Sequence, residues 1–258
     1  MRKQIDYDHF SISQVNEFAR CARYYYYHRI RGMPLRPLYD LASGKALHAG
    51  LEEHNKERVK HGGLRPRQIL EVAVANLEAM PDVSELDVTL GEAKDQLAKD
   101  SLPPTATYVE STERDLPAPT SDEHVEKLIE AKVGDRPFVA YIDVQLPDRL
   151  IDYKLLGRRK SATEVLRDPQ LVLYRHLVGL PAGFVQLVRG REQADYAEAQ
   201  PSPAITAGVL NWIIDTVKQI EAAKVSGIWP RCSPVSWMCN SCVFFNRCFR
   251  EKEVENAA

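Results

Sequence analysis

The acidic side chains best placed for chemistry lie in the stretch FVAYIDVQLPDRLIDYKLL, residues 138–156. Pro147–Asp148 is typical of a turn, so the stretch predicts a β-hairpin. A symmetric loop centred on these two residues places Asp143 directly opposite Asp152. Opposed side chains in a sheet have Cβ atoms about 4.5–5.5 Å apart, and like charges at that separation are destabilising. A divalent cation between the two carboxylates would reverse the sign of the interaction, and oxygen ligands suit Mg²⁺ or Mn²⁺.

Alternation along the two strands predicts one almost wholly apolar face and one polar face. Lys154 lies two residues beyond Asp152 on the polar face, where its ammonium group could hold an attacking water or a phosphate oxygen. The pattern also fits a solvated hairpin in which Lys154 offsets one aspartate, and an odd loop length would break the pairing. The expected apolar face contains Phe138, Ala140, Ile142, Val144, Ile151, Tyr153 and Leu155, and the polar face Tyr141, Asp143, Gln145, Leu150, Asp152 and Lys154.

Other elements must position these residues. The sequence predicts helices before the hairpin, and both strands and helices around and after it. Capping residues, apolar periodicity and Gly or Pro punctuation predict the element boundaries. The expected helices run from Ser11 or Ser13 to Gly32, after Gly44 to Gly62, near 66–80, near 84–100 with Pro103–Pro104 as breaker, near 168–179 and over about 204–225. Strand-like stretches are expected at 107–118, 126–146, 148–156 and 184–190.

This order predicts an α/β fold with a central mixed β-sheet flanked by helices, a helical N-terminal layer and a Cys-rich C-terminal module. We expect a single domain over residues 1–258. Its parts are a mainly helical segment at 10–104, the catalytic sheet core at 105–200, and a C-terminal helix and tail at 201–258.

Composition places the chain among globular proteins. Its 258 residues are 44% hydrophobic and 27% charged, enough for one buried core. The net charge of −2 argues against a wholly basic nucleic-acid coat, although a local basic groove is compatible with it. No apolar run approaches the roughly 18 residues that a membrane span needs, and the first residues lack a signal-peptide core. We therefore expect a soluble, cytoplasmic protein of a bacterial, archaeal or phage-infected cell, with no membrane partner.

The five cysteines are unevenly placed. Cys21 stands alone, whereas Cys232, Cys239, Cys242 and Cys248 crowd the C-terminal end. In a chain with no export signal a metal or cluster site is favoured over disulfides. Four thiolates can hold either a 4Fe–4S cluster or a structural Zn²⁺, and the C-x2-C spacing alone does not separate the two.

The hairpin resembles motifs II and III of the PD-(D/E)XK nuclease superfamily, in its RecB-like branch, where a strand Asp precedes Asp-Tyr-Lys. Gly44-Lys-Ala-Leu-His48 is similar to the upstream G-x-x-x-H motif, and Gln170-Leu-Val-Leu-Tyr174 to the Q-x-x-x-Y motif. The cysteine pattern resembles the iron–sulfur subgroup that CRISPR-associated RecB-like nucleases share with a recombination helicase–nuclease subunit. Ala140 and Leu155–Leu156 depart from common residues of the family.

The resemblance implies a role for each matching residue. Asp143 and Asp152, the main-chain carbonyl of Tyr153 and a ring nitrogen of His48 would hold Mg²⁺ or Mn²⁺, and Lys154 would position the nucleophile or stabilise developing charge. Gln170 and Tyr174 would contact DNA, although Tyr174 could equally be a core aromatic. The ligands of a 4Fe–4S cluster would be Cys21, Cys239, Cys242 and Cys248, with Cys232 left as a free thiol that could substitute for Cys239.

The expected function is metal-dependent hydrolysis of DNA phosphodiester bonds by an exonuclease, on single strands or free ends. It would serve recombination, repair, phage DNA metabolism or CRISPR adaptation, with the matching partner proteins, and related nucleases include ring-shaped homo-oligomers. The alternative is a non-catalytic DNA-binding or scaffold subunit that keeps the fold. Since no P-loop G-x4-G-K-[ST] occurs, the chain is not expected to be an ATP-driven helicase.

Four further features have two readings each. Residues 157–160 (GRRK) fit either a phosphate contact or a solvated loop, and most of Tyr24–Tyr27 should pack in the core rather than stack on DNA. Glu52, one turn along from His48, could support the site but is expected to be solvated. Glu110, on a predicted core strand, is a candidate for an additional acidic residue near the metal.

Overall fold

The computed structural model describes residues 9–35, 38–60, 62–240 and 242–249. Its internal contacts divide the chain into two compact units. The first, here called the terminal unit, consists of Met1–Arg36, Ala131–Val139 and Asn211–Ala258. The second, the sheet unit, consists of Pro37–Glu130 and Ala140–Leu210.

A five-stranded sheet with the strand order β1-β2-β3-β4-β5 is the centre of the fold. β2 pairs antiparallel with β3, β3 parallel with β4, and β4 antiparallel with β5, which confirms the expected mixed sheet. The strands are β1 (Val125–Val133), β2 (Arg136–Gln145), β3 (Leu150–Leu156), β4 (Ala182–Val188) and β5 (Ala194–Ala199).

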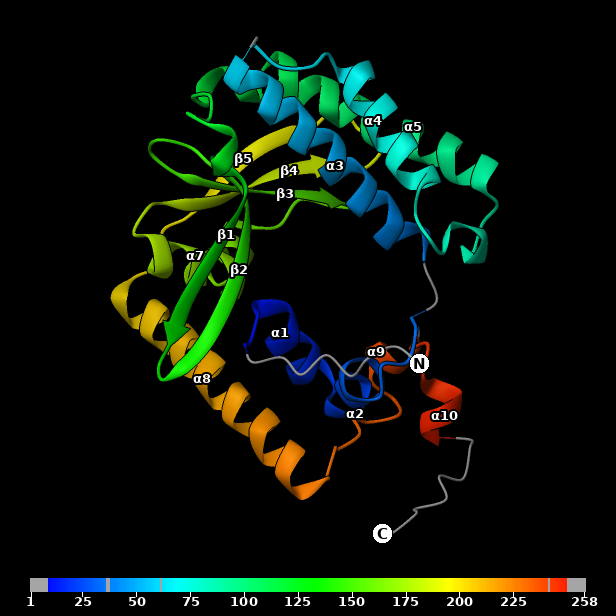
Figure 1. Ribbon diagram of the computed structural model, residues 1–258, viewed down its shortest axis with the longest axis vertical. Helices are drawn as coiled ribbons and strands as arrows, with labels where there is room; N and C mark the ends of the chain where they lie inside the picture. Colours follow the sequence, from blue (N-terminus) through cyan, green and yellow to red (C-terminus); the bar gives the residue numbers. More distant parts are fainter. Residues whose placement is uncertain (1–8, 36–37, 61, 241, 250–258) are drawn as a thin grey trace. The chain divides into compact units, whose positions relative to one another are not determined.

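Helices cover both faces of the sheet within the sheet unit. Three helices lie together on one side of β3–β5 (Figure 1) and pack on one another through small and leucine side chains: α3 (Tyr39–Lys60), α4 (Pro66–Glu78) and α5 (Leu90–Glu110). Two shorter helices pack on the opposite face: α6 (Ala162–Leu166) and α7 (Pro169–Val178). Short 3₁₀ turns occupy Val83–Glu85, Thr112–Asp115 and Asp122–His124. None of the helices in the described residues is long and apolar enough to cross a membrane.

The apolar side chains of β2 are buried as predicted, but they do not share one face. Val144 packs with Ile151 and Tyr153 in the core beneath α3 and α5. Ile142 instead packs in the core beneath α7, together with Leu150, which the sequence placed on the polar face. The simple two-residue alternation is therefore wrong for β2, because its packing changes between Ile142 and Val144.

Helix α5 continues through Pro103–Pro104, so the predicted helix end at the prolines and the strand at 107–118 are wrong. A proline at position 104 cannot donate to the carbonyl of Asp100. The main-chain N–H of Gly190 donates to that carbonyl instead, at 2.9 Å. The last turns are then stabilised by burial of Tyr108, whose side chain is fully inaccessible. Glu110 consequently ends a helix and is exposed, rather than lying on a core strand.

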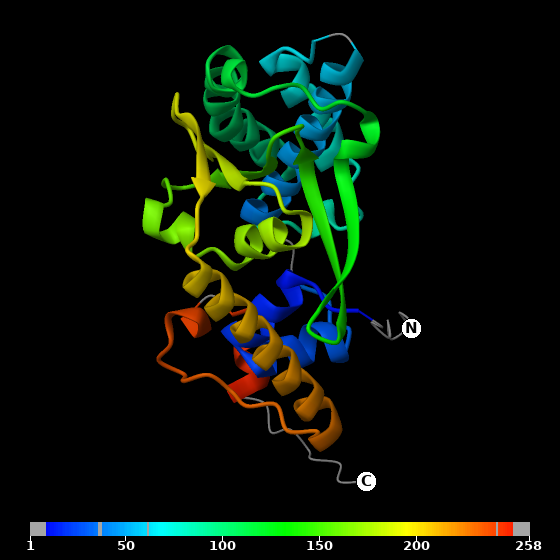
Figure 2. The ribbon, with the colours of Figure 1, turned by 90° about the vertical axis from the view of Figure 1, so that its left-hand side faces the viewer.

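The terminal unit brings both ends of the chain into one structure. Figure 1 and Figure 2 both show the long helix α8 beside the N-terminal helix of this unit. The single helix expected up to Gly32 is divided, because Cys21 adopts an extended conformation and separates α1 from α2. Its helices are α1 (Ile12–Arg20), α2 (Ala22–Tyr25), a π-helical turn at Tyr26–Ile30, α8 (Pro203–Ser226, of which residues from 211 onward belong to this unit), α9 (Trp237–Asn240) and α10 (Phe245–Phe249).

Candidate functional site

The β2–β3 hairpin has the register that its turn predicts. Val144 pairs with Ile151, and the same register places Asp143 opposite Asp152. At this point the Asp143 carboxylate, rather than a backbone carbonyl, accepts the main-chain N–H of Tyr153, at 2.7 Å. Asp143 is therefore fixed by the neighbouring strand through one carboxylate oxygen.

Asp152 is buried, with 2% of the residue exposed, and two donors hold its carboxylate. Lys154 Nζ lies 2.5 Å from Oδ2, and Gln170 Nε2 donates to Oδ1 at 2.5 Å. Burial, with the nearby charge of Asp143, raises the pKa of Asp152 to about 6. Burial opposes the charge on Lys154, but the attraction of Asp152 and Asp143 outweighs it and raises the pKa of Lys154. The ammonium group therefore stays charged at neutral pH.

His48 and Glu126 join Asp143 at the edge of this site. His48 Nδ1, on α3, lies 3.3 Å from Asp143 Oδ2. One ligand atom from each of His48, Glu126 and Asp143 lies within 4.8 Å of the other two. Glu126, near the start of β1, has a φ of +49°, which is the left-handed region. A non-glycine residue costs of order 1 kcal/mol there, and such strain concentrates at functional sites.

When no cation lies between them, the charged carboxylates of Glu126 and Asp143 repel each other, and the pKa values of Glu126 and His48 are shifted. Burial, followed by the charges of Asp143 and Glu52, raises the pKa of Glu126 to about 7. Burial disfavours the charged form of His48, yet the adjacent Asp143 raises the pKa of the ring above its usual value. A bound divalent cation would favour the ionised carboxylates and the neutral imidazole. The donor set, one imidazole and two carboxylates, suits Mn²⁺ and, through its oxygens, Mg²⁺.

Gln170 and Tyr174 reach this site from α7. Asp168 caps the helix by accepting the main-chain N–H of Gln170 at 3.0 Å. Gln170 Nε2 also donates to Tyr174 Oη at 2.9 Å, and Tyr174 Oη donates to the main-chain carbonyl of Tyr141 at 2.5 Å. The two side chains thus connect the carboxylate of Asp152 to the backbone of β2, two residues before Asp143.

A family model of the PD-(D/E)XK nuclease superfamily matches residues 9–249. The chain belongs to the PD-(D/E)XK nuclease superfamily. A solved structure from Eubacterium rectale with the printed name "Putative exonuclease" has a similar fold. The TM-score is 0.54 at 13% identity, over 93% of this chain and 90% of that one. The search of curated proteins finds no match.

Glu126 is a residue of this candidate site that sequence reasoning misses. Several glutamates lie in or beside β1, among them Glu123 and Glu130, and nothing in their spacing distinguishes Glu126. Its proximity to His48 and Asp143 depends on how β1 enters the sheet and on a backbone conformation that the sequence does not signal. Glu52 is partly buried and forms an ion pair with Lys56 at 2.5 Å, and its charge contributes to the raised pKa of Glu126, so it lies beside the site.

The basic loop after β3 is neutralised by neighbouring carboxylates. Arg158 pairs with Glu164 at 2.7 Å, Arg159 with Asp195 at 2.9 Å and Lys160 with Asp168 at 2.6 Å. A side chain that already has a carboxylate partner must exchange it before it can bind a phosphate. This pattern favours the structural reading of residues 157–160.

The tyrosine run packs largely within the terminal unit. Tyr25 is 1% exposed and Tyr27 is 2% exposed. Tyr25 and Tyr26 stack on Trp229, with ring centroids 6.0 and 5.5 Å apart, and Tyr24 makes an edge contact with Phe244. The expectation that most of these rings are core residues is in accord with this packing.

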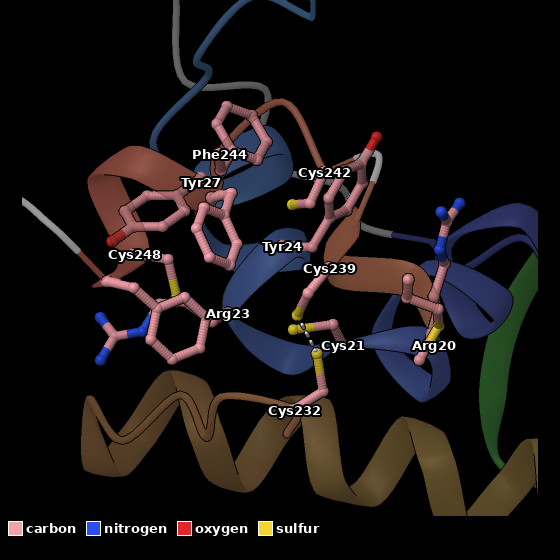
Figure 3. Close-up of a pocket in the computed structure, with 13 residues that line it drawn as sticks. Arg20, Cys21, Arg23, Tyr24, Tyr27, Cys232, Cys239, Cys242, Phe244 and Cys248 are labelled. Atoms are coloured by element: carbon pink, nitrogen blue, oxygen red, sulfur yellow. Dashed lines mark hydrogen bonds between the residues drawn. The ribbon is translucent and has the colours of Figure 1, made fainter. Parts of the chain in front are cut away.

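All five cysteines line one pocket of the terminal unit (Figure 3). Cys21 reaches it from the break between α1 and α2, and the other four come from the C-terminal segment. Tyr24, Tyr27 and Phe244 line the same pocket, with Arg20 and Arg23 beside it. The cysteine near the N-terminus and those near the C-terminus are more than two hundred residues apart in the sequence. Their sulfur atoms nevertheless line the same pocket.

Proposed function

We propose that this chain is a metal-dependent deoxyribonuclease that hydrolyses phosphodiester bonds as an exonuclease. The observation that carries the proposal is the convergence of His48, Glu126 and Asp143 beside the Asp152–Lys154 pair, since a phosphodiesterase needs a cation site next to a fixed positive donor. The name of the Eubacterium rectale structure agrees with the exonuclease mode.

The residues present fit a divalent cation, and the proposed ligands are His48, Glu126 and Asp143, together with Asp152 and the main-chain carbonyl of Tyr153. When bound, the cation supplies a lower pKa for an attacking water and offsets negative charge at the scissile phosphate. The chain's own contribution is to hold the ligands in place: α3 presents His48, and the Tyr153 N–H orients Asp143.

Lys154 is the proposed electrostatic catalyst. Its ammonium is anchored by Asp152, and 29% of the Lys154 side chain is exposed, so a phosphate oxygen can approach it. A preorganised positive donor aimed at developing charge is typically worth a factor of 10² to 10³ in rate. Asp152 thereby has two proposed tasks, as a ligand and as the anchor of Lys154.

Replacing Glu126 with glutamine tests its place in the cation site. The pKa of Glu126 is about 7 in the folded chain without metal, well above that of a glutamate in the unfolded chain. Because the unfolded chain releases this proton at lower pH, the free energy of unfolding should fall as pH rises from about 4.5 through 7 when EDTA is present. Glu126→Gln removes this loss, so the variant should be more stable than wild type at pH 8, by about 1 kcal/mol after allowance for solvent screening. At pH 4 the two should be equal. Urea unfolding at both pH values measures the difference.

The same variant should also respond less to metal. Mn²⁺ at a fixed concentration should raise the melting temperature of wild type more than that of Glu126→Gln. Glu130→Gln, on the same strand and exposed, is the matched control and should behave as wild type. An unchanged metal response in Glu126→Gln would remove Glu126 from the ligand set.

The hydrogen bonds of Gln170 and Tyr174 support a role in positioning Asp152 and β2, as an alternative to the expected DNA contact. Tyr174→Phe removes the hydroxyl that satisfies the Tyr141 carbonyl and should cost about 1 kcal/mol of stability. If the hydroxyl positions β2, kcat should fall several-fold at unchanged KM, whereas a DNA contact predicts a raised KM. Tyr196→Phe, which loses only a hydrogen bond to Glu198 on the same strand, is the control. Steady-state kinetics on a single-stranded oligonucleotide separates the two roles.

An exposed aromatic ring beside the site supports a single-stranded substrate. Tyr141 is 59% exposed, although its backbone carbonyl is held by Tyr174 and it lies two residues before Asp143. Stacking of one unpaired base on such a ring is worth about 1–3 kcal/mol. Tyr141→Ala should therefore weaken single-strand binding about 5- to 100-fold and leave duplex binding unchanged. Tyr141→Phe should bind as wild type. Fluorescence anisotropy with Ca²⁺ in place of Mn²⁺ measures binding to each substrate. If Tyr141→Ala weakens binding to single strands and to duplexes equally, the ring does not stack on an unpaired base.

The decisive test of function is digestion of single strands and duplexes labelled at either end, with Mg²⁺ or Mn²⁺ and with EDTA. We expect sustained cleavage that EDTA stops and that Asp152→Ala abolishes, with products that report the direction of degradation. Binding without cleavage by the metal-loaded wild type would instead support the non-catalytic scaffold.

We also propose that the cysteine pocket holds a 4Fe–4S cluster whose ligands are Cys21, Cys239, Cys242 and Cys248. All five cysteines line one pocket. The spacing of one distant cysteine, Cys21, with Cys239, Cys242 and Cys248 supports the cluster over a single structural Zn²⁺, whose sites usually pair two short C-x2-C segments.

A further inference from the structure

The cysteine pocket contains one more sulfur than a 4Fe–4S cluster can use. Such a cluster takes four thiolates, one for each iron. Five sulfurs line the pocket (Figure 3), and Cys232 is the one outside the proposed ligand set. The inference that follows rests on the 4Fe–4S cluster proposed above.

Cys232 and Cys239 occupy nearly the same place. Their Sγ atoms are 3.3 Å apart, which is a direct contact, and the dashed line in Figure 3 marks it. Ligands of different irons stand at separate corners of the cluster, so two sulfurs in direct contact cannot serve two corners. They compete for one.

The backbone around Cys232 keeps its thiol in this position. The carbonyl of Pro230, two residues earlier, accepts the main-chain N–H of Arg23 at 3.0 Å, which joins the segment to α2. Cys239 lies on the four-residue helix α9, and its thiol also contacts the carbonyl of Ser233 at 3.4 Å. Both sulfurs are thus presented to one corner by short, separately anchored segments.

We propose that Cys232 and Cys239 are interchangeable ligands for one corner of the cluster. Either sulfur alone completes the set with Cys21, Cys242 and Cys248. Cys232 is then a reserve ligand that retains the cluster when Cys239 is lost to oxidation or substitution.

The test uses anaerobically reconstituted full-length protein and four variants: Cys232→Ser, Cys239→Ser, the double variant, and Cys242→Ser. Iron and sulfide content, visible absorption and the electron paramagnetic resonance spectrum of the reduced cluster are the measurements. We expect about four irons per chain in wild type and in both Cys232→Ser and Cys239→Ser, with a changed spectrum in Cys239→Ser. The double variant and Cys242→Ser should retain less than one-tenth of the iron.

The inference is overturned if either single variant, Cys232→Ser or Cys239→Ser, loses iron as completely as the double variant does. Wild-type protein that takes up zinc, or no iron, overturns the cluster itself and the inference with it. The two failures are distinguishable, because the first leaves wild type fully loaded. Far-ultraviolet circular dichroism separates loss of iron from loss of the fold.

Discussion

Asp143→Asn should abolish metal-dependent cleavage while the protein remains folded. Asparagine keeps the oxygen that accepts the Tyr153 N–H, so the hairpin geometry is preserved. It removes the charge that lies against His48 and that would bind the cation. Loss of several kcal/mol of transition-state stabilisation corresponds to a rate lower by about 10³-fold or more. Single-turnover cleavage of a labelled oligonucleotide at saturating Mn²⁺ measures it.

The matched control for Asp143→Asn is Asp148→Asn, the same substitution in the same hairpin. Asp148 is half-exposed in the turn, and its ion-pair partner among the described residues is its neighbour Arg149. This variant should cleave at the wild-type rate. If Asp143→Asn kept more than one-tenth of the wild-type rate, or if it lost the hairpin fold by circular dichroism, the proposed role of Asp143 would be wrong.

The second large effect is expected from Cys242→Ser, because loss of one corner should empty the cluster. A crosslink between Cys21 and the C-terminal cysteines closes a loop of more than two hundred residues. In the chain-entropy model such a closure is worth on the order of 5 kcal/mol. Hydrogen exchange should therefore accelerate sharply in α1, α2 and α10, which belong to the terminal unit, and much less in α3 and α4 of the sheet unit.

Chelation provides the internal control for Cys242→Ser. Wild type stripped of iron should reach the exchange rates of the variant, and stripping should leave the variant unchanged. Equal protection of the terminal unit in iron-loaded wild type and in Cys242→Ser would contradict the stabilising role of the cluster. Serine is close in volume to cysteine, so loss of packing alone should be small.

The hairpin shows how much of the site could be predicted. A turn at Pro147–Asp148 fixes a register, and the register fixes which side chains are opposed, so the placement of Asp143 against Asp152 followed from local rules. Strand alternation also predicted that Lys154 lies on the same face as Asp152, and the two side chains form an ion pair. Short-range chemistry in a regular element is what a single sequence specifies best.

Where the predictions were wrong, a distant partner supplied what the local sequence lacked. Pro104 should end a helix, but the N–H of Gly190 takes the carbonyl that the proline leaves unpaired. Strand β5, with the sequence ADYAEA, has no β-branched residue and was not predicted; it forms because β4 offers a complete edge. Glu126 required a left-handed backbone that no motif signals.

The terminal unit is assembled from segments at the two ends of the chain, and this has a consequence for its biosynthesis. Its N-terminal helices leave the ribosome long before Asn211 and the residues after it have been translated. At about 5–20 residues per second, Cys21 waits roughly 10–40 s for its sulfur partners near the C-terminus. Nascent chains stalled before Cys239 should therefore emerge with a folded sheet unit and an iron-free N-terminal segment, and insertion of the proposed cluster would follow translation.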